Sequence, residues 1–364
     1  MYFNLLKRDG GRAANTIVAR LFVSRFDAVA LRAPRTDSNK LCKFVGMTKG
    51  EAIVVKNAGS HFVLGLLPQW ELFPAVLRGR VRLKASSSTN PIAVGDRVEY
   101  EYEDAPTEKT PAQITRILPR HNHLIRKSTN LSRQSHVIAA NLDRVFLVCT
   151  LYFPEIKLPF LDRQLVSCEM FKIPVTIVLN KVDLYRDEAK DYLDYFKSIY
   201  TEAGYDVLET SAKTGEGIEE LRAMCRGKEG EQGINLISGE SGVGKSSIIR
   251  AIDPTLDPKV GGISLSHLQG KHTTSLYEMY PISSGGYIID TPGLRGFGLY
   301  GLEKEEIYTY FPEMLKASEK CRFTPCSHTH EPGCAVKEAV ERGEISQERY
   351  ASYLGMLEED SKFR

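Results

Sequence analysis

The strongest chemical signal in the sequence is one glycine-rich stretch, which reads Gly239-Glu240-Ser241-Gly242-Val243-Gly244-Lys245-Ser246-Ser247. It follows an apolar, strand-like run at residues 234–237 and leads into a helical pattern that ends near residue 252. Glycines let successive backbone N–H groups point at one anion, and a helix start adds partial positive charge. Lys245 would reach the β- and γ-phosphates of a nucleotide as a catalytic residue, and the Ser246 hydroxyl would bind Mg²⁺. The stretch therefore predicts a phosphate-binding loop rather than a chance glycine turn.

Two motifs upstream of this loop predict which base is bound. A buried strand over residues 174–179 runs into Asn180-Lys181-Val182-Asp183, and Ser211-Ala212-Lys213 follows the next helix and strand. The Asp183 carboxylate can accept hydrogen bonds from N1–H and the N2 amine of guanine, and adenine has neither donor there. Asn180 and Lys181 can brace the base, while backbone N–H groups of residues 211–213 can reach the guanine O6. The two motifs together predict a guanine nucleotide.

Two downstream segments predict the rest of a nucleotide switch, and they read Gly270-Lys271-His272-Thr273-Thr274 and Asp290-Thr291-Pro292-Gly293. Asp290 ends a strand and would hold Mg²⁺ through a water, while Thr274 would complete the metal shell. The Gly293 N–H would donate to the γ-phosphate and sense its loss. His272 is predicted to orient or deprotonate the attacking water. The alternatives for His272 are an exposed loop residue or a contact to RNA.

The order of these motifs is unusual. In Ras-like GTPases the phosphate-binding loop comes first and the guanine motifs come last, whereas here residues 180–183 and 211–213 precede residue 239. A circular permutation explains this order, because termini that lie close together in a fold can be joined. The permutation also makes residues 290–293 lead directly into the C-terminal part of the chain, so loss of the γ-phosphate could move that part.

A cluster of metal-ligating residue types follows, with Cys321, Cys326, His328 and Cys334 inside fourteen residues. Three thiolates and one imidazole match a tetrahedral zinc site, and four protein ligands leave no open position for catalysis. We therefore expect one structural zinc ion per chain. His330 is an alternative to His328 as the fourth ligand, and unligated thiols in a loop are the alternative to a metal site.

Composition sets the frame for these motifs. The chain has 364 residues, 42% hydrophobic and 26% charged, with a net charge of +2. No apolar run approaches the ~20 residues needed to span a bilayer. Apart from the cluster, the cysteines are scattered, which is typical of a reducing compartment. We expect a cytoplasmic, monomeric protein of two or three domains without a membrane segment.

The N-terminal part divides into a basic extension and a β domain. Residues 1–46 carry nine Lys/Arg against three Asp, and we expect them to be disordered or to precede a native start at Met47. A transit peptide and an RNA-binding arm are the alternatives. Residues 47–118 contain five short strand patterns separated by turn residues, which predict an OB-type β-barrel.

One strand of this barrel is predicted over residues 75–84, and its alternation places Arg78, Arg80, Arg82 and Lys84 on one face. Such a face can lie against an RNA backbone, although a solvated strand face is an equally good reading. Residues 119–136 are expected to be a basic linker. Helix and strand patterns then alternate over residues 137–300, which predicts an α/β domain, and residues 301–364 are expected to form an α-helical zinc-binding module.

From about Met47 to its end, the chain resembles the RsgA family of circularly permuted bacterial GTPases. The resemblance rests on the barrel, the permuted motifs and the Cys₃His cluster together. It implies slow GTP hydrolysis stimulated by the small ribosomal subunit, a role in late maturation of that subunit, and rRNA binding through the barrel and the zinc module. The family usually shows Gly-Arg-His-Thr-Thr-Thr where this chain has Gly-Lys-His-Thr-Thr-Ser at residues 270–275, which keeps His272 and both central threonines.

The catalytic group cannot be the one that Ras-like enzymes use, since Leu294 stands where they carry a water-orienting glutamine. An apolar side chain cannot orient water, so another group must do so. Two other functions remain to be weighed. A GTP-binding ribosome scaffold with negligible turnover would carry the same motifs, and a GTP-dependent kinase is disfavoured because no acceptor-substrate motif is visible.

Overall fold

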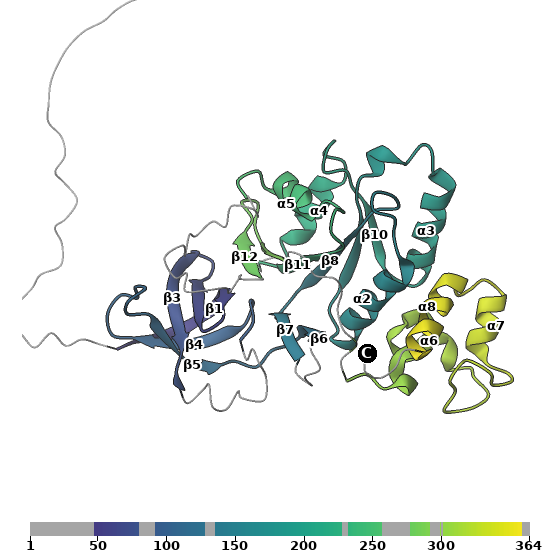
Figure 1. Ribbon diagram of the computed structural model, residues 1–364, viewed down its shortest axis with the longest axis horizontal. Coiled ribbons are helices and arrows are strands. Elements are labelled where there is room, and N and C mark those ends of the chain that lie inside the picture. The colour runs from purple at the N-terminus through teal and green to yellow at the C-terminus, as the bar shows by residue number, and fades with distance from the viewer. Residues whose placement is uncertain are drawn as a thin grey trace, which may run out of the picture. The chain divides into compact units, whose positions relative to one another are not determined.

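The computed structural model describes residues 47–79, 92–127, 135–227, 232–256, 277–291, 299 and 301–358 (Figure 1). The expectations for residues 1–46 fall outside this range. Within it, no helix has both the length and the apolar character that a membrane crossing requires.

A closed five-stranded barrel begins the described chain. Its strands are β1 (Thr48–Ala58), β2 (His61–Leu66), β3 (Glu71–Leu77), β4 (Arg97–Tyr102) and β5 (Ala112–Ile117). The strand order is β1-β2-β3-β5-β4, and β1 also pairs with β4, which closes the barrel. Alternate side chains point inward and form one buried cluster, as the period of two in a strand requires. The predicted OB-type barrel is confirmed.

The third strand differs from the prediction. Expected over residues 75–84, it runs from Glu71 to Leu77, because a turn at residues 67–70 sets its pairing with β2 from Leu66↔Glu71 onward. The strand therefore ends before the alternating basic residues that guided the prediction begin in the sequence. Arg78 is the first of them, and Arg80, Arg82 and Lys84 fall outside the described residues.

The segment expected to be a linker contains regular structure. Strands β6 (His123–Lys127) and β7 (Ser135–Ala140) pair antiparallel as a separate two-stranded sheet. Leu124 and Ile138 are fully buried in it, and the Ala140 N–H donates to the Val94 carbonyl at 2.9 Å. Basic residues mask this pattern in the sequence, yet the apolar positions pack against their neighbours and make the segment an element of the fold.

The α/β domain contains a largely parallel sheet, ordered β10-β9-β8-β11-β13-β12. The sheet consists of β8 (Arg144–Cys149), β9 (Val175–Leu179), β10 (Asp206–Glu209), β11 (Ile234–Ser238), β12 (Glu278–Pro281) and β13 (Tyr287–Asp290). Only β12 runs antiparallel to its neighbour β13. Parallel neighbours bring the carboxyl ends of β8, β9, β10, β11 and β13 to one edge, which is where such sheets bind ligands.

Helices cover both faces of this sheet and explain why its strands are apolar throughout. On one face α2 (Leu158–Met170) and α3 (Lys190–Glu202) pack against the side chains of Val145 and Leu147. On the other face α4 (Ile218–Cys225) and α5 (Lys245–Ile252) pack against those of Phe146 and Val148. Strands buried on both sides are read correctly from continuous apolar runs.

The C-terminal module is helical, as predicted. It contains the 3₁₀ helix η2 (Lys304–Tyr310) and the helices α6 (Pro312–Ser318), α7 (Ala335–Glu341) and α8 (Gln347–Glu358). Arg349 of α8 donates to Glu313 at 2.8 and 3.0 Å and to Asp162 of α2 at 2.8 Å, with its guanidinium 4.6 Å from the Phe311 ring centroid. Because Arg349 and Asp162 are both fully buried, this pair joins the module to the α/β domain.

Candidate nucleotide-binding site and metal centre

The predicted phosphate-binding loop lies between the end of β11 at Ser238 and the start of α5 at Lys245. Gly239 has a φ of 148°, and a Cβ there would lie 2.1 Å from the Val148 carbonyl oxygen. Gly244 has a φ of 100°, and its Cβ would lie 2.5 Å from Asn180 Nδ2. Only glycine fits these two positions. The Lys245 ammonium donates to the carbonyls of Gly239 and Glu240 at 2.7 and 2.8 Å, so it lies inside the loop.

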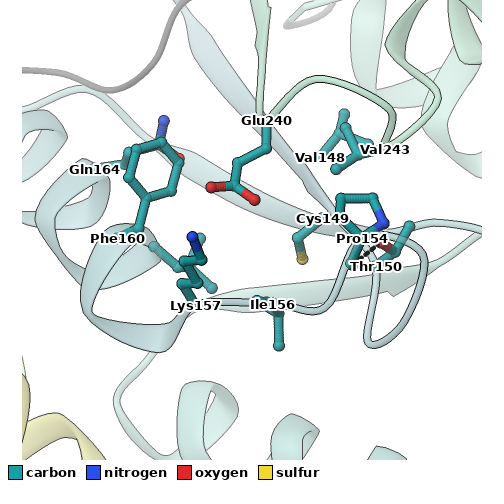
Figure 2. A pocket seen from close by; sticks show the side chains of 11 residues that line it. Val148, Cys149, Thr150, Pro154, Ile156, Lys157, Phe160, Gln164, Glu240 and Val243 are labelled. Atoms are coloured by element: carbon teal, nitrogen blue, oxygen red, sulfur yellow. Dashed lines mark hydrogen bonds between the residues drawn. The ribbon is translucent and has the colours of Figure 1, made fainter.

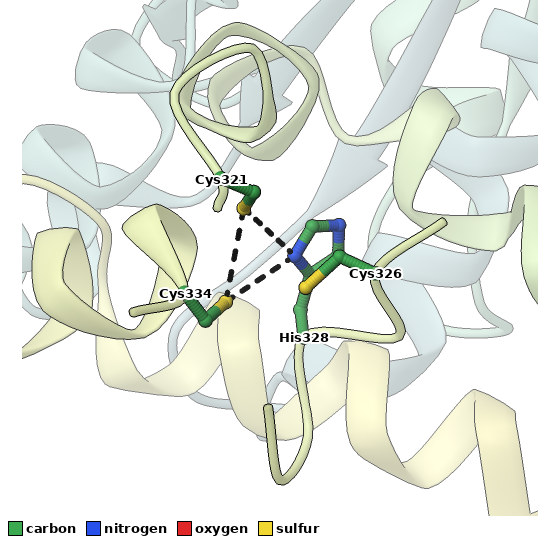
Figure 3. Close-up of side chains that lie close together, drawn as sticks. All are labelled: Cys321, Cys326, His328 and Cys334. Atoms are coloured by element: carbon green, nitrogen blue, oxygen red, sulfur yellow. Dashed lines mark hydrogen bonds between the residues drawn. The ribbon is translucent and has the colours of Figure 1, made fainter. Parts of the chain in front are cut away.

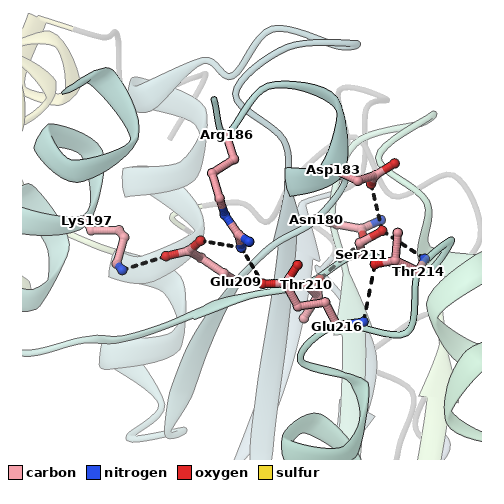
Figure 4. Close-up of polar contacts among 9 residues, drawn as sticks. All are labelled: Asn180, Asp183, Arg186, Lys197, Glu209, Thr210, Ser211, Thr214 and Glu216. Atoms are coloured by element: carbon pink, nitrogen blue, oxygen red, sulfur yellow. Dashed lines mark hydrogen bonds and ion pairs between the residues drawn. The ribbon is translucent and has the colours of Figure 1, made fainter. Parts of the chain in front are cut away.

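Asn180 connects this loop to both guanine motifs. Its Nδ2 donates to the Val243 carbonyl of the loop at 2.8 Å. Its Oδ1 accepts from the Ala212 N–H at 3.2 Å. It also accepts from the Thr210 hydroxyl at 3.2 Å, and this second contact lies between residues drawn in Figure 4. The side chain is 1% exposed, which strengthens these bonds by excluding competing water. One buried amide thus holds three separate chain segments together.

The other residues of the guanine motifs line the same edge. Lys181 donates to the Gly242 carbonyl and to the Phe153 carbonyl, both at 2.7 Å. Asp183 lies in the 3₁₀ helix η1 (Val182–Leu184) and accepts from the Ser211 hydroxyl at 2.7 Å, with Lys213 Nζ 3.9 Å from its other oxygen. Val182 is buried and anchors η1. An oriented carboxylate at this edge suits the N1–H and N2 donors of guanine.

Asp290 lies beside the phosphate-binding loop because β13 pairs in parallel with β11, with Ile237 opposite Asp290. The Thr291 hydroxyl donates to the Ile237 carbonyl at 2.8 Å and fixes this end of the strand. Burial raises the pKa of Asp290, and the positive charge of Lys245 acts against that rise. Burial likewise lowers the pKa of Lys245, with Asp290 opposing the shift. Carboxylate and hydroxyl oxygens from Asp290 and Ser246 are the hard donors that Mg²⁺ prefers.

Of the other residues predicted to contact the nucleotide or Mg²⁺, the structure describes some and not others. Ser241, Gly242 and Ser247 belong to the loop and to the first turn of α5. His272, Thr274 and Gly293 lie outside the described residues.

A small cavity lies next to the phosphate-binding loop (Figure 2). It lies between the end of β8 and the start of α2 and is lined mainly by apolar side chains, including Val148, Phe160 and Val243. Figure 2 shows the Glu240 carboxylate directed into this cavity. Its lining includes Glu240 and Val243 of the phosphate-binding loop, and none of Lys245, Asn180 and Asp183.

The four predicted metal ligands converge in the C-terminal module (Figure 3). The ligand atoms of Cys321, Cys326, His328 and Cys334 all lie within 4.8 Å of one another. His328 Nδ1 is 3.4 Å from the Cys334 sulfur and 3.6 Å from the Cys321 sulfur. Tetrahedral zinc with bonds of about 2.3 Å to sulfur places its ligands roughly 3.5–4 Å apart. The cluster can therefore bind a metal, and its soft donor set fits zinc.

His328, and not His330, belongs to this cluster. Its ring is buried and stands edge-on to Tyr308 at 4.5 Å, while His330 is exposed and contacts the Thr329 hydroxyl. The Tyr350 hydroxyl donates to the His328 carbonyl at 2.7 Å and holds the ligand loop against α8. Four ligands from the chain leave no open position, which is typical of a structural site.

The predicted basic strand face is only partly described. Arg78 is half-exposed and forms an ion pair with Glu101 of β4, so its charge is already partly matched within the barrel. The other three members of that face lie outside the described residues.

Comparison with known proteins agrees with this geometry. A family model described as RsgA GTPase matches residues 117–300. A relative from Bacteroides fragilis, named Small ribosomal subunit biogenesis GTPase RsgA, is 46% identical over 316 residues, which cover 86% of this chain and 99% of the relative. The chain belongs to the RsgA GTPase family. A relative of the same name from Porphyromonas gingivalis is 44% identical over 317 residues, covering 86% of this chain and 98% of that protein.

Solved structures extend the RsgA likeness to the fold. YjeQ from Thermotoga maritima has a TM-score of 0.67 and 34% identity, covering 85% of this chain and 98% of that one. YloQ, described as a circularly permuted GTPase, has a TM-score of 0.63 and 26% identity, covering 88% of this chain and 96% of that one. The predictions of the family and of the permuted motif order are confirmed.

Sequence reasoning missed the residues that support Asn180. The Thr210 hydroxyl donates to the Asn180 side chain, and the Tyr185 hydroxyl donates to the backbone carbonyl of Asn180 at 2.7 Å. Thr210 stands directly before the Ser211 motif, which is a usable signal. Tyr185 gives no such signal, because an aromatic residue after a motif usually reads as core.

Proposed function

We propose that the chain is a ribosome-stimulated GTPase that binds the small ribosomal subunit and assists its late maturation. The observation that carries the proposal is Asn180, whose single buried side chain links the phosphate-binding loop to both guanine motifs. The names of the relatives support the ribosomal role. In this role GTP binding and hydrolysis act as a conformational switch.

Each site residue has a role in this proposal. Residues 239–247 would surround the phosphates with backbone N–H groups, and Lys245 would neutralise developing charge. Asp183 would select guanine, with Lys181 and residues 211–213 supporting the base. Ser246, Asp290 and Thr274 would hold Mg²⁺, which when bound neutralises phosphate charge. Gly293 would contact the γ-phosphate. The Cys₃His cluster would hold one structural zinc.

His272 is proposed to orient or deprotonate the attacking water. The reason is Leu294, which occupies the position where Ras-like enzymes carry a glutamine and cannot bond water. An imidazole can change protonation near neutral pH, and positioned acid–base groups contribute about 10²–10⁴-fold to a rate. His272→Ala should therefore remove most of the stimulated rate while GTP affinity stays near that of the parent.

The partners follow from the same proposal. The barrel, with Arg78, Arg80, Arg82 and Lys84, and the zinc module would contact rRNA, and a ribosomal partner implies a cytoplasmic location. We propose a monomer, because one chain supplies every motif of the nucleotide site.

Turnover measured with and without purified small ribosomal subunits tests the function. We expect slow phosphate release from the chain alone and a large increase when subunits are added. GTP binding without an increase would leave a ribosome-bound scaffold, and it would refute the enzyme proposal. Neutralising Arg78, Arg80, Arg82 and Lys84 should weaken subunit binding and lower its salt slope by about one unit for each phosphate that the chain no longer neutralises.

A further inference from the structure

Four large aromatic side chains are exposed side by side on the α/β domain. Tyr152, Phe153, Tyr192 and Tyr195 are 36%, 71%, 38% and 45% exposed, which makes them half of the eight large hydrophobic side chains exposed in the described chain. The Tyr152 ring centroid lies 6.5 Å from that of Phe153 and 6.3 Å from that of Tyr192. Tyr192 and Tyr195 are three positions apart on α3 and so share a face. We call these four residues the aromatic ridge.

The ridge is held in place before any partner arrives. Phe153 has a φ of 63°, a left-handed conformation that a bulky residue adopts only when its surroundings impose it. Its carbonyl accepts the Lys181 ammonium at 2.7 Å, and the next carbonyl, that of Pro154, accepts the Thr150 hydroxyl at 2.7 Å. The Tyr195 hydroxyl donates to Glu348 at 2.5 Å. Rigid aromatic side chains bind with little loss of conformational entropy.

Carboxylates dominate the two segments that carry the ridge. Residues 152–157 and 187–195 contain Glu155, Asp187, Glu188, Asp191 and Asp194 against Lys157 and Lys190, so five negative charges less two positive charges leave −3. All five carboxylates belong to exposed residues, and none forms an ion pair with another described residue.

The pKa of Tyr192 agrees with this charge pattern. It is raised by burial and further by the neighbouring Tyr152, Glu155 and Glu348. The face therefore repels the phosphates of a nucleic acid, and it attracts cations that can also lie over aromatic rings.

Arginine has the positive charge and the flat side chain that suit this face, since its planar guanidinium stacks on aromatic faces and pairs with carboxylates. We propose that the aromatic ridge binds an arginine-bearing segment of a protein, and not RNA, when the chain engages the small ribosomal subunit. The proposal rests on the proposed function and adds to it that this face of the α/β domain meets protein.

The ridge is directly connected to the nucleotide site. The Lys181 ammonium that bonds the Phe153 carbonyl also bonds the Gly242 carbonyl of the phosphate-binding loop. A segment bound on the Phe153 ring thus contacts a residue whose backbone is joined to that loop through one side chain, that of Lys181. Occupation of the ridge can therefore bias the loop that holds the phosphates.

Site-specific photocrosslinking tests the chemistry of the partner. Phe153→p-benzoylphenylalanine and Tyr192→p-benzoylphenylalanine keep an aromatic ring at each position, and Leu315→p-benzoylphenylalanine on α6 is the control at a similarly exposed position (43%). The full chain with a non-hydrolysable GTP analogue is bound to purified small subunits and irradiated. We expect both ridge positions to crosslink to protein, within a peptide that contains arginine, and the control to crosslink elsewhere or not at all. Crosslinks to rRNA, or to residues 1–46 of the chain itself, would overturn the proposal.

Two further variants exclude a purely structural effect. Tyr192→Ser, which leaves the hydrogen bond from Tyr195 to Glu348 intact, should weaken subunit binding by about threefold, the scale of removing one exposed cation–π interaction. Asp191→Asn with Asp194→Asn should weaken it less and reduce its salt dependence. Both variants should keep the hydrolysis rate of the chain alone. If small subunits bind the parent chain and stimulate its hydrolysis, but bind the tyrosine variant equally well, the ridge proposal is wrong and the proposed function still stands. If the parent chain neither binds nor responds, the proposed function fails first.

Discussion

Asn180 illustrates how much of the candidate site depends on a single side chain. Its amide bonds two other segments, one at Thr210 and Ala212, 30 and 32 positions away, and one at Val243, 63 positions away. Replacing Asn180 by alanine would leave its partners, the Val243 carbonyl, the Thr210 hydroxyl and the Ala212 N–H, without this hydrogen bond. Each buried group left unpaired costs about 1–3 kcal/mol. The asparagine therefore positions the loop and the base motifs relative to each other, whereas the role proposed for Asp183 is to select the base.

Asp183→Asn should change base preference. The carboxylate is held by the Ser211 hydroxyl at the base edge, and an amide cannot accept from both guanine donors. Losing a charged hydrogen-bond pair costs about 1.5–3 kcal/mol, so GTP affinity should fall by roughly 10–10²-fold while xanthosine triphosphate binds better than it does to the parent. Equilibrium binding of GTP, ATP and xanthosine triphosphate measures this. Asp187→Asn is the control, and equal affinity of the parent for ATP and GTP would contradict the assignment.

Cys321→Ser should remove the metal. The four ligand atoms lie within 4.8 Å, and replacing a thiolate by a hydroxyl removes one of four strong bonds. Chain purified without chelator should contain about one zinc per molecule by elemental analysis, and the variant should contain much less and lose helical signal from its C-terminal module. Cys225→Ser, in a buried cysteine outside the cluster, should keep its zinc. A folded parent without metal would refute the site.

At the residue scale, the sequence predicted where the motif residues lie in the fold better than it predicted which side chains hold them in place. Motif residues could be placed because they follow directly on apolar strands, whose carboxyl ends share one edge. The side chains that hold them, such as Thr210 and Tyr185, come from tertiary contacts that no local pattern encodes. The same holds for Arg349 and Asp162, whose buried ion pair joins residues 187 positions apart.

At the scale of elements, strands buried on both faces were predictable, whereas β12 and the β6–β7 pair were not. Residues 145–148 are apolar on both sides because helices cover both faces of the sheet. By contrast, Glu278–Pro281 has only four residues, begins with a charge and ends in proline, and it forms β12 through pairing with β13 and β1. The β6–β7 pair was hidden because its apolar runs, residues 124–125 and 137–140, are short and lie among basic and polar residues.

Asp253 makes the junction between α5 and the β12–β13 turn dependent on pH. One of its oxygens accepts from the Thr255 N–H and hydroxyl, and the other accepts from the Ser283 N–H at 2.7 Å. Burial alone would raise the pKa of Asp253, but these hydrogen bonds lower it to about 2. A folded-state pKa below the unfolded value gives stability that is complete above about pH 4 and is lost as the pH falls toward 2.

Asp253→Asn should therefore destabilise the fold by about 2 kcal/mol at pH 7 and by clearly less at pH 3. Denaturant unfolding of variant and parent at both pH values measures the difference, because other acidic groups titrate equally in the two proteins. Asp104→Asn at an exposed position is the control and should cost little at either pH. An equal cost for Asp253→Asn at both pH values would show that its charge contributes nothing.

At the scale of the whole molecule, the barrel and the α/β domain share one core. Ile53 and Val55 of β1 belong to the same buried cluster as Met279 of β12 and Ile289 of β13. The Trp70 ring, in the turn after β2, stacks on Tyr287 at 5.4 Å. Strand β1 also pairs with β12, which closes a sheet edge that would otherwise be open. We therefore expect the two domains to unfold in one cooperative transition rather than in two.

The ion pair between Lys56 and Glu278 gives the sharpest test of this continuity. It joins β1 to β12 at 2.9 Å, with side chains 10% and 14% exposed. Lys56→Met leaves a buried carboxylate without its partner, and breaking such a pair costs about 3–5 kcal/mol, whereas replacing both members with apolar residues is often neutral. Denaturant unfolding should thus show a large loss for Lys56→Met and recovery of most of it when Glu278→Leu is added.

Lys49→Met is the matched control, because Lys49 lies on the same strand and its pair with Glu101 is 67% exposed on the lysine side and lies within the barrel. Its cost should stay below about 1 kcal/mol. In Lys56→Met the single transition should move as a whole, since the barrel and the sheet lose stability together. If the barrel signal were unchanged and only the α/β domain unfolded earlier, the shared core would not couple them, and the two domains would have to be treated as independent folding units.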